Sequence, residues 1–427
     1  MEGWPQCWWL AGSTRQAAVS YTQPTSTWFA FSPSVSSRKK SLRQISRLLF
    51  TPTQMRTFYS RQIVKLNYKI HRISLQEWGY PLLDKLRMVW RYGLGSLLKL
   101  DYFIDNLLNH FGQIYPKLDA GQGFHSVREL LVAMSPVSRD GAASSEMTDL
   151  AGQTLSHKLA ALGVANRLVE EIVTVASRVN YGQMPASLHA FVGSVGLAGM
   201  GGSLFAVQGG NKKVVECGLA QSGARVLRSL VEEVRQTETG SYSLQYSVGN
   251  QTQDSQFEAV VIATPLTADQ VSLEVAGTFP GRYHTTVATI VRGDPRPEAF
   301  GFKDPTTFTS TNFFLSPNSV IISVSKLSPV DYNPSKDDAI PPVYKIFSTR
   351  LLSTTELSNM FAGIEFVHSV SWLAYPSYTT QDDLSTFQIS PGLFYSNRIE
   401  WAASAMEMSA LSARNVANLV AAYLAEK

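Results

Sequence analysis

The run Ala259-Val-Val-Ile-Ala263 constrains the fold of this chain more than any other stretch, and Thr264 and Pro265 follow it directly. Five consecutive apolar residues that stop at a Thr-Pro step are typical of a parallel strand that is buried on both faces. In open sheets of this kind, ligands bind beyond the carboxyl ends of the strands. The run therefore predicts an α/β domain whose ligand-binding edge carries Thr264 and Pro265.

A Gly-Gly turn lies upstream of this strand. Gly209 and Gly210 precede a helical pattern over residues 213–221, and strand-like segments follow at 224–227 and 230–234. Backbone N–H groups at the start of a helix have no partner within the helix, so they bind anions readily. This turn is therefore a candidate for contact with a nucleotide.

The C-terminal region carries a second cofactor signal. Residues 393–410 lead into a helical pattern over 413–424, and small residues such as Ala402, Ala403 and Ala405 crowd the start of that helix. Small side chains allow a flat ring to approach closely, and the positive end of the helix dipole lies there. We therefore expect a cofactor ring beside the start of this helix.

Together, these segments are similar to the flavin amine-oxidase superfamily and, within it, resemble the prenylcysteine oxidases (prenylcysteine lyases). The resemblance runs from about Gln76 onward and rests on separated motifs in the family's order. These motifs are Tyr181-Gly-Gln, Ala190-Phe-Val-Gly, Gln208-Gly-Gly-Asn-Lys, Trp372-Leu-Ala-Tyr-Pro and Glu400-Trp-Ala.

The resemblance implies a fold and a reaction. The fold is a doubly wound, Rossmann-like FAD-binding domain with an α+β substrate domain. The reaction is oxidation of the thioether of S-prenylcysteine by FAD, which yields cysteine, a prenyl aldehyde and, with molecular oxygen, hydrogen peroxide. The implied location is the lysosome or the secretory pathway. A flavin-less prenyl-lipid binding protein and an amine oxidase are the alternatives.

The resemblance also implies the site residues. Val231 would meet the adenine edge through its backbone, and Glu407 has the alternative role of a helix-stabilising acid. The expected cofactor-binding residues are Gly209, Gly210, Asn211, Val231, Thr264, Pro265, Glu400, Ala403, Met406 and Glu407. The expected lining of an apolar tunnel for the prenyl tail is Phe191, Phe205, Trp372 and Tyr375, each of which is alternatively an ordinary core residue.

Residues 1–75 differ from the rest of the chain. The family begins with a strand and a Gly-x-Gly-x-x-Gly turn for the pyrophosphate, and no such turn occurs here, so we expect an N-terminally incomplete dinucleotide-binding domain. The aperiodic composition predicts a disordered or alternative N-terminus, with a transit peptide as the other option. The later glycines at 196–202 are interpreted as a packing joint or loop, with a phosphate cradle as the alternative.

The remaining segments divide into helical and β-rich parts. Residues 76–204 read as the helical part of the substrate domain, 205–266 and 391–427 as the FAD-binding domain, and 267–390 as a β-rich substrate part. Strands are expected at 284–292, 319–324 and 343–347, an aromatic loop at 372–378, and a helix at 353–361.

Single residues in these parts are predicted as follows. Thr354 or Thr355 caps the helix at 353–361. His189 reads as a core histidine, with a catalytic base as the alternative. The two helical patterns within 77–115 read as core, with a membrane-surface role as the alternative.

Composition excludes several other functions. Eleven Lys or Arg residues and one acid before position 77 give that end +10, so the rest of the chain carries −6 of the total of +4. The positive charge is therefore no argument for nucleic-acid binding. Two cysteines and seven scattered histidines give no metal-ligand spacing, and no Gly-x-Ser-x-Gly elbow occurs. Asn250-Gln-Thr is a glycosylation sequon, with chance occurrence as the alternative.

Overall fold

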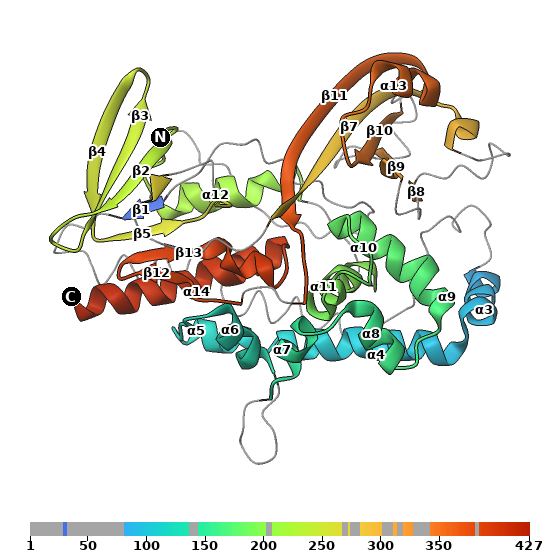
Figure 1. The fold of residues 1–427 in the computed structure, drawn as a ribbon, viewed down its shortest axis with the longest axis horizontal. Helices are drawn as coiled ribbons and strands as arrows, with labels where there is room; N and C mark the ends of the chain where they lie inside the picture. Colours follow the sequence, from blue (N-terminus) through green and yellow to red (C-terminus); the bar gives the residue numbers. More distant parts are fainter. Residues whose placement is uncertain are drawn as a thin grey trace.

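The computed structural model consists of a helical part, two neighbouring sheets and a long curved sheet (Figure 1). It describes residues 29–31, 81–135, 144–201, 207–266, 272–273, 282–300, 311–313, 319–327, 342–380 and 384–427. Phe205 therefore lies outside the described residues. No described helix has the length and apolar character that crossing a bilayer would require.

The helical part occupies residues 81–201 and confirms the helices expected there. Its π-helical segment, Val169–Val173, runs directly into α10. The helices are α3 (Pro81–Tyr92), α4 (Leu94–Phe111), α5 (Ile114–Asp119), α6 (Val127–Met134), α7 (Glu146–Ala151), α8 (Leu155–Ala161), α9 (Asn166–Leu168), α10 (Thr174–Tyr181) and α11 (Ala190–Gly201).

Apolar residues three and four apart explain why these helices pack. In α4, the buried side chains are Leu97, Leu100, Phe103, Leu107 and Phe111, which form one face of the helix. The glycines at 196, 199 and 201 lie inside α11 and not in a loop that follows a strand. The expectation that they are no phosphate cradle fits this position.

The first sheet has the order β1-β5-β13-β12. Its strands are β1 (Phe29–Phe31), β5 (Ala259–Ile262), β13 (Leu393–Tyr395) and β12 (Gln388–Ser390). The predicted strand is confirmed as β5, which is largely buried and parallel to β13. Its other edge pairs antiparallel with β1, so β5 is not parallel on both edges as a doubly wound sheet predicts. The aperiodic N-terminal sequence gave no signal for β1.

A second sheet has the order β4-β3-β2-β6 and lies next to the first (Figure 1). Its strands are β2 (Leu230–Gln236), β3 (Tyr242–Val248), β4 (Gln251–Phe257) and β6 (Ser272–Leu273). Buried residues from both sheets form a common core of β2, β3, β5 and β13 side chains. Helix α12 (Lys212–Ser222) confirms the helical prediction, but residues 224–227 form no strand, because the chain ends α12 at Gly223 and enters β2 only at Leu230.

The long curved sheet has the order β11-β7-β10-β9-β8, and its antiparallel pairing confirms the strands predicted in this part of the chain. Its strands are β7 (Tyr283–Pro295), β8 (Thr311–Phe313), β9 (Ile321–Leu327), β10 (Val343–Ser348) and β11 (Phe361–Pro376). The aromatic loop expected at 372–378 is wrong up to Pro376. Trp372 to Pro376 continue β11 because they pair with residues 283–286 of β7.

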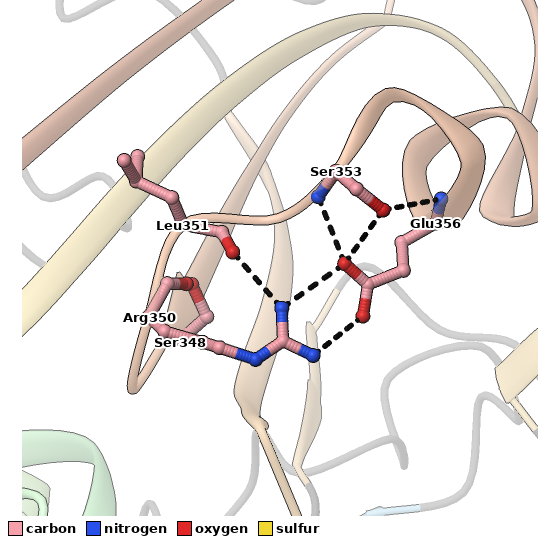
Figure 2. Close-up of polar contacts among 5 residues, drawn as sticks. All are labelled: Ser348, Arg350, Leu351, Ser353 and Glu356. Atoms are coloured by element: carbon pink, nitrogen blue, oxygen red, sulfur yellow. Dashed lines mark hydrogen bonds and ion pairs between the residues drawn. The ribbon is translucent and has the colours of Figure 1, made fainter.

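Helix α13 (Thr354–Met360) lies against this sheet and is held by a polar network at its start (Figure 2). The predicted caps Thr354 and Thr355 are wrong, because Ser353 is the N-cap and forms a capping box with Glu356. Arg350 adds a two-point ion pair to the same carboxylate, with Nη2 at 2.8 Å and Nη1 at 3.1 Å. Ser353 was not predicted as the N-cap, because the sequence pattern does not distinguish its hydroxyl from those of the neighbouring Thr354 and Thr355.

Helix α14 (Met406–Glu426) joins the helical part to the sheet that contains β5 and β13 (Figure 1). The Asn415 side chain bonds both backbone groups of Phe124, at 2.7 and 2.8 Å. The Asn418 amide donates to the carbonyls of Leu118 and Gln122. These buried amides lock α14 onto the end of α5 and the loop that follows it, because unpaired polar groups would be costly there.

Candidate functional site

Two helix N-termini meet at the centre of the molecule. Asn211, at the start of α12, has its side-chain amide nitrogen 4.0 Å from the sulfur of Met406, the first residue of α14. Neither helix start receives a side-chain cap from the described residues. Uncapped helix starts expose backbone N–H groups and positive dipole ends. The two therefore make one position that favours negative charge.

The Gly-Gly turn borders this position. Gly209 and Gly210 have φ angles of 76° and 95°, a backbone conformation that side chains with a Cβ avoid. A Cβ on Gly210 would meet nothing within 4 Å among the described atoms. The turn thus leaves open space next to the start of α12, which Asn211 holds in place by accepting a hydrogen bond from the Val207 amide.

The carboxyl ends of β5 and β13 lie at one edge of the sheet, because the two strands are parallel. The hydroxyl of Tyr395 accepts a hydrogen bond from the Leu266 amide at 3.1 Å, and the hydroxyl of Ser396 donates to the Ile262 carbonyl at 3.1 Å. Thr264 and Pro265, both half-buried, lie between these contacts in the chain. The predicted ligand edge therefore has a fixed backbone.

The carboxylate of Glu400, which can bind a proton, lies just beyond this edge. Its carboxylate accepts hydrogen bonds from Tyr283 Oη at 2.7 Å and from Asn397 Nδ2 at 3.1 Å. Burial raises the pKa of Glu400, and the hydrogen bonds from Tyr283 and Asn397 oppose that rise. Burial and the neighbouring Glu400 raise the pKa of Tyr283, which keeps it protonated as a donor.

An aromatic cluster connects this group with the helical part. Tyr181 of α10 packs edge-on against Tyr375 and Tyr378, with ring centroids 5.6 and 5.4 Å away. Tyr375 stacks on His284 at 5.4 Å, with planes 9° apart. Gly182 fits beneath this stack because a Cβ there would lie 2.4 Å from His284 Nε2.

Tyr378 is the centre of the cluster. Its backbone exchanges two hydrogen bonds with the Gln183 side chain, at 2.9 and 3.1 Å. Its hydroxyl accepts from the Ser404 amide at 2.8 Å, just before α14. The Tyr181-Gly-Gln motif, the end of β11 and the segment after Glu400 therefore meet at one place, although they are far apart in sequence.

The amino-acid sequence is similar to those of known proteins. Residues 75–427 match the sequence profile of the family described as prenylcysteine lyase. The chain belongs to the prenylcysteine lyase family. The resemblance expected from the motifs is confirmed, and membership in this family of oxidoreductases implies a flavin cofactor.

Relatives of known name support the same assignment. The chain is 32% identical over 360 residues to human prenylcysteine oxidase 1-like, which covers 81% of this chain and 71% of the relative. It is 30% identical over 374 residues to bovine prenylcysteine oxidase 1, covering 82% and 71%. Among solved structures, a putrescine oxidase double mutant aligns at a TM-score of 0.48 with 12% identity, covering 78% of this chain and 76% of that one. That likeness is too weak to carry an argument.

The structure brings most of the predicted cofactor residues to one region of the molecule. Ala403, by contrast, is fully buried and belongs to the helical core, so it borders no open space among the described residues. Val231 is buried between the two sheets in β2. Glu407 accepts a hydrogen bond from Tyr115 of α5, an arrangement that favours the structural alternative for this acid. Those near the helix starts or the sheet edge are Gly209, Gly210, Asn211, Thr264, Pro265, Glu400 and Met406.

The predicted tunnel residues separate. Tyr375 lies in the aromatic cluster, and Phe191 is fully buried in the helical core that Tyr375 packs against. Trp372 lies three residues before Tyr375 on β11 and packs against Phe347 of β10, with centroids 6.1 Å apart. Asn250 is exposed in the β3–β4 turn, as a glycosylation site would require.

A flavin fits the residues that are present. The Gly-Gly turn has open space beside Gly210, and the paired helix starts favour an anionic ring or phosphate. Within the described part of the chain, the buried Trp401 Nε1 and His284 Nε2 also have no hydrogen-bond partner. Buried polar atoms of this kind are usually satisfied, so a bound group or water is expected near them.

Sequence reasoning missed Tyr283 and His284. Both stand at the start of β7, where the β-branched run that marks the strand has not yet begun. Their importance comes from the register that places them opposite Pro376 and Tyr375 of β11. The Tyr181-Gly-Gln and Trp372-Leu-Ala-Tyr-Pro motifs hinted at this contact, but only the strand pairing names the partners.

Proposed function

We propose that this protein is an FAD-dependent thioether oxidase that cleaves S-prenylcysteine. The carbon of the prenyl group that is attached to sulfur loses a hydride, and water adds to that carbon. The resulting hemithioacetal breaks its carbon–sulfur bond to give cysteine and a prenyl aldehyde. Molecular oxygen takes up the two electrons and leaves as hydrogen peroxide. The family match over residues 75–427 is the observation that carries this proposal.

Bound FAD would supply the two-electron acceptor, and the chain supplies its binding and orientation. Gly209, Gly210 and Asn211 would hold the flavin through backbone groups beside Met406, where the two helix starts meet. Thr264 and Pro265 would border the ribose or pyrophosphate at the sheet edge, and Val231 would face the adenine through its backbone. Positive dipole ends next to the ring favour the negative charge of a reduced flavin.

Glu400 is the group of this chain best placed to take a proton from the attacking water. Its carboxylate is screened from bulk water, and its raised pKa brings it closer to the working range of a general base. Tyr283 holds the carboxylate in one orientation through the 2.7 Å hydrogen bond to Oε2. Tyr283 is thus the positioning residue of this pair.

The prenyl tail requires an apolar passage, which the aromatic cluster and the adjoining helical core would line. Tyr181 and Tyr375, which pack edge-to-face with ring centroids 5.6 Å apart, would contribute apolar ring surface to this lining. Burial raises the pKa of Tyr375 to about 12, so its ring and hydroxyl stay neutral beside an apolar ligand. Lysosomal or secretory location and peripheral contact with a membrane belong to the same proposal.

The test uses the purified full chain. An absorbance scan measures bound flavin, and incubation with farnesylcysteine in air follows farnesal, free thiol and hydrogen peroxide. Equal molar amounts of the three products are expected. Putrescine and spermine serve as parallel substrates, because an amine oxidase would consume them.

Each alternative has its own result. Bound flavin with turnover of amines and none of farnesylcysteine would make the protein an amine oxidase. Farnesylcysteine binding without flavin, after an attempt to load FAD, would make it a binding protein. Either result overturns the proposal.

A further inference from the structure

The first two helices carry apolar side chains on their outer surface. On each helix the exposed apolar residues recur every four positions, so they lie on one side of that helix. We call these residues the α3–α4 ridge: Leu86 and Trp90 of α3, and Leu94, Leu98 and Tyr102 of α4, with exposed fractions of 56%, 86%, 53%, 46% and 71%.

The ridge is not the core face of these helices. Leu97, Leu100 and Phe103 of α4 are buried and pack into the helical core on another side. The same helix therefore has two apolar sides, of which only one is covered by described residues. Several large apolar side chains exposed on neighbouring helices are typical of an interaction site.

The charges along the ridge are mostly positive. Between Leu86 and Leu100 the sequence contains Arg87, Arg91 and Lys99 and no acidic residue. Arg91 pairs with the carboxylate of Glu171 at 2.6 Å, whereas Lys99 donates a hydrogen bond to the Gly163 carbonyl. The acids nearby are Asp84 in the first turn of α3, Glu170 and Glu171 of the adjoining π-helical segment, and the partly buried Asp101 and Asp105 of α4.

The position of the ridge suits a flat partner. Helices α3 and α4 run along the outer edge of the helical part, at the opposite end of the molecule from the β2–β4 sheet (Figure 1). Tryptophan and tyrosine with flanking arginine and lysine are the residues that favour the boundary between lipid headgroups and acyl chains. A protein partner would need complementary acids, whereas an anionic bilayer supplies negative charge along its whole surface.

We propose that the α3–α4 ridge binds the surface of an anionic lipid bilayer. Trp90 enters the boundary region together with Leu86 and Leu94, and Arg87 and Lys99 lie against the lipid headgroups. This inference rests on the membrane contact included in the proposed function and names the surface that makes it. The contact needs neither flavin nor substrate, so it can be tested apart from the reaction.

Vesicle co-sedimentation of the full chain tests the contact. Vesicles of phosphatidylcholine mixed with an equal amount of phosphatidylserine should sediment the wild-type protein. The double variant Trp90→Ala, Leu94→Ala should bind roughly tenfold more weakly or worse, because two large apolar contacts are lost. The variant Arg87→Gln, Lys99→Gln should lose most of the preference over pure phosphatidylcholine and most of the dependence on salt.

Phe366→Ala is the matched control, since Phe366 is 53% exposed but lies on β11. It should bind vesicles as the wild type does. Equal binding by the wild type and the Trp90, Leu94 variant overturns the proposal, as does absence of wild-type binding. A wild-type dimer in light scattering that becomes monomeric in that variant would assign the ridge to a second copy of the chain instead. Flavin content and peroxide release are measured separately, so failure of the reaction leaves this result unaffected.

Discussion

Tyr283→Phe is the sharpest test of the proposed base, because it removes one hydroxyl and leaves the ring. The Glu400 carboxylate would then keep only the 3.1 Å hydrogen bond from Asn397. A hydrogen bond to a charged group contributes about 1.5–3 kcal/mol, and about 1.4 kcal/mol is a factor of ten. The ionised form of Glu400 should therefore become harder to populate by roughly tenfold to a hundredfold.

The direction of the pH effect follows from the raised pKa of Glu400. A base must be ionised to act, so activity rises with pH through that pKa, and loss of the Tyr283 hydroxyl moves the acid limb to higher pH. The assay is kcat/KM for farnesylcysteine as a function of pH, with flavin content measured for each variant. On the acid limb the variant should be slower by roughly ten- to a hundredfold, and well above it the two should converge.

Two further variants make the test decisive. Glu400→Gln should remove the acid limb together with most of the activity, by roughly a hundredfold or more. Tyr246→Phe loses a hydroxyl that contacts only Ser255 at 3.1 Å, and it should keep the wild-type profile. An unchanged acid limb in Tyr283→Phe would refute the pairing of Tyr283 with the catalytic base.

Three other predictions concern binding and stability. Gly210→Val should abolish flavin binding, measured by absorbance, because a β-branched residue is strained at a φ of 95° and would fill the open turn. Ser353→Ala should lower the free energy of unfolding in urea by about 1 kcal/mol through loss of the α13 cap, whereas Thr355→Ala should leave it nearly unchanged. Burial lowers the pKa of His189 to about 4, so the unfolded chain binds its proton first and stability should fall as pH drops from 6.5 towards 4. His189→Gln should make the melting temperature depend less on pH over that window. An equally steep decrease of the melting temperature in the variant would show that other groups cause the pH dependence.

The elements with strong local signals were predictable. The apolar run that became β5, the β-branched runs of the curved sheet and the helical periodicity of α4 each reflect a pattern confined to neighbouring residues. Residues 372–376 misled because their aromatic and proline content resembles a loop. Pairing with β7, which no local pattern encodes, makes them a strand.

The candidate site was predictable only in part, for a related reason. Gly209, Gly210 and Met406 stand in recognisable motifs at helix starts, so the sequence located them. The pairing of Glu400 with Tyr283 spans 117 residues and depends on the 3-10 helix Ser396–Trp401 lying close to the start of β7. Ala403 remains a prediction as a cofactor residue, and in this structure it is fully buried in the helical core.

Helix α14 also has a consequence for biosynthesis. Its asparagines satisfy backbone groups that precede them by 291 to 300 residues, so these contacts form only after residues 406–426 have left the ribosome. Until then the helical part lacks one wall of its core, and the backbone groups of Leu118, Gln122 and Phe124 lack their side-chain partners in α14. Contacts of such long range slow folding and leave apolar surface exposed during synthesis. We therefore expect the nascent chain to need chaperones until α14 has been synthesised.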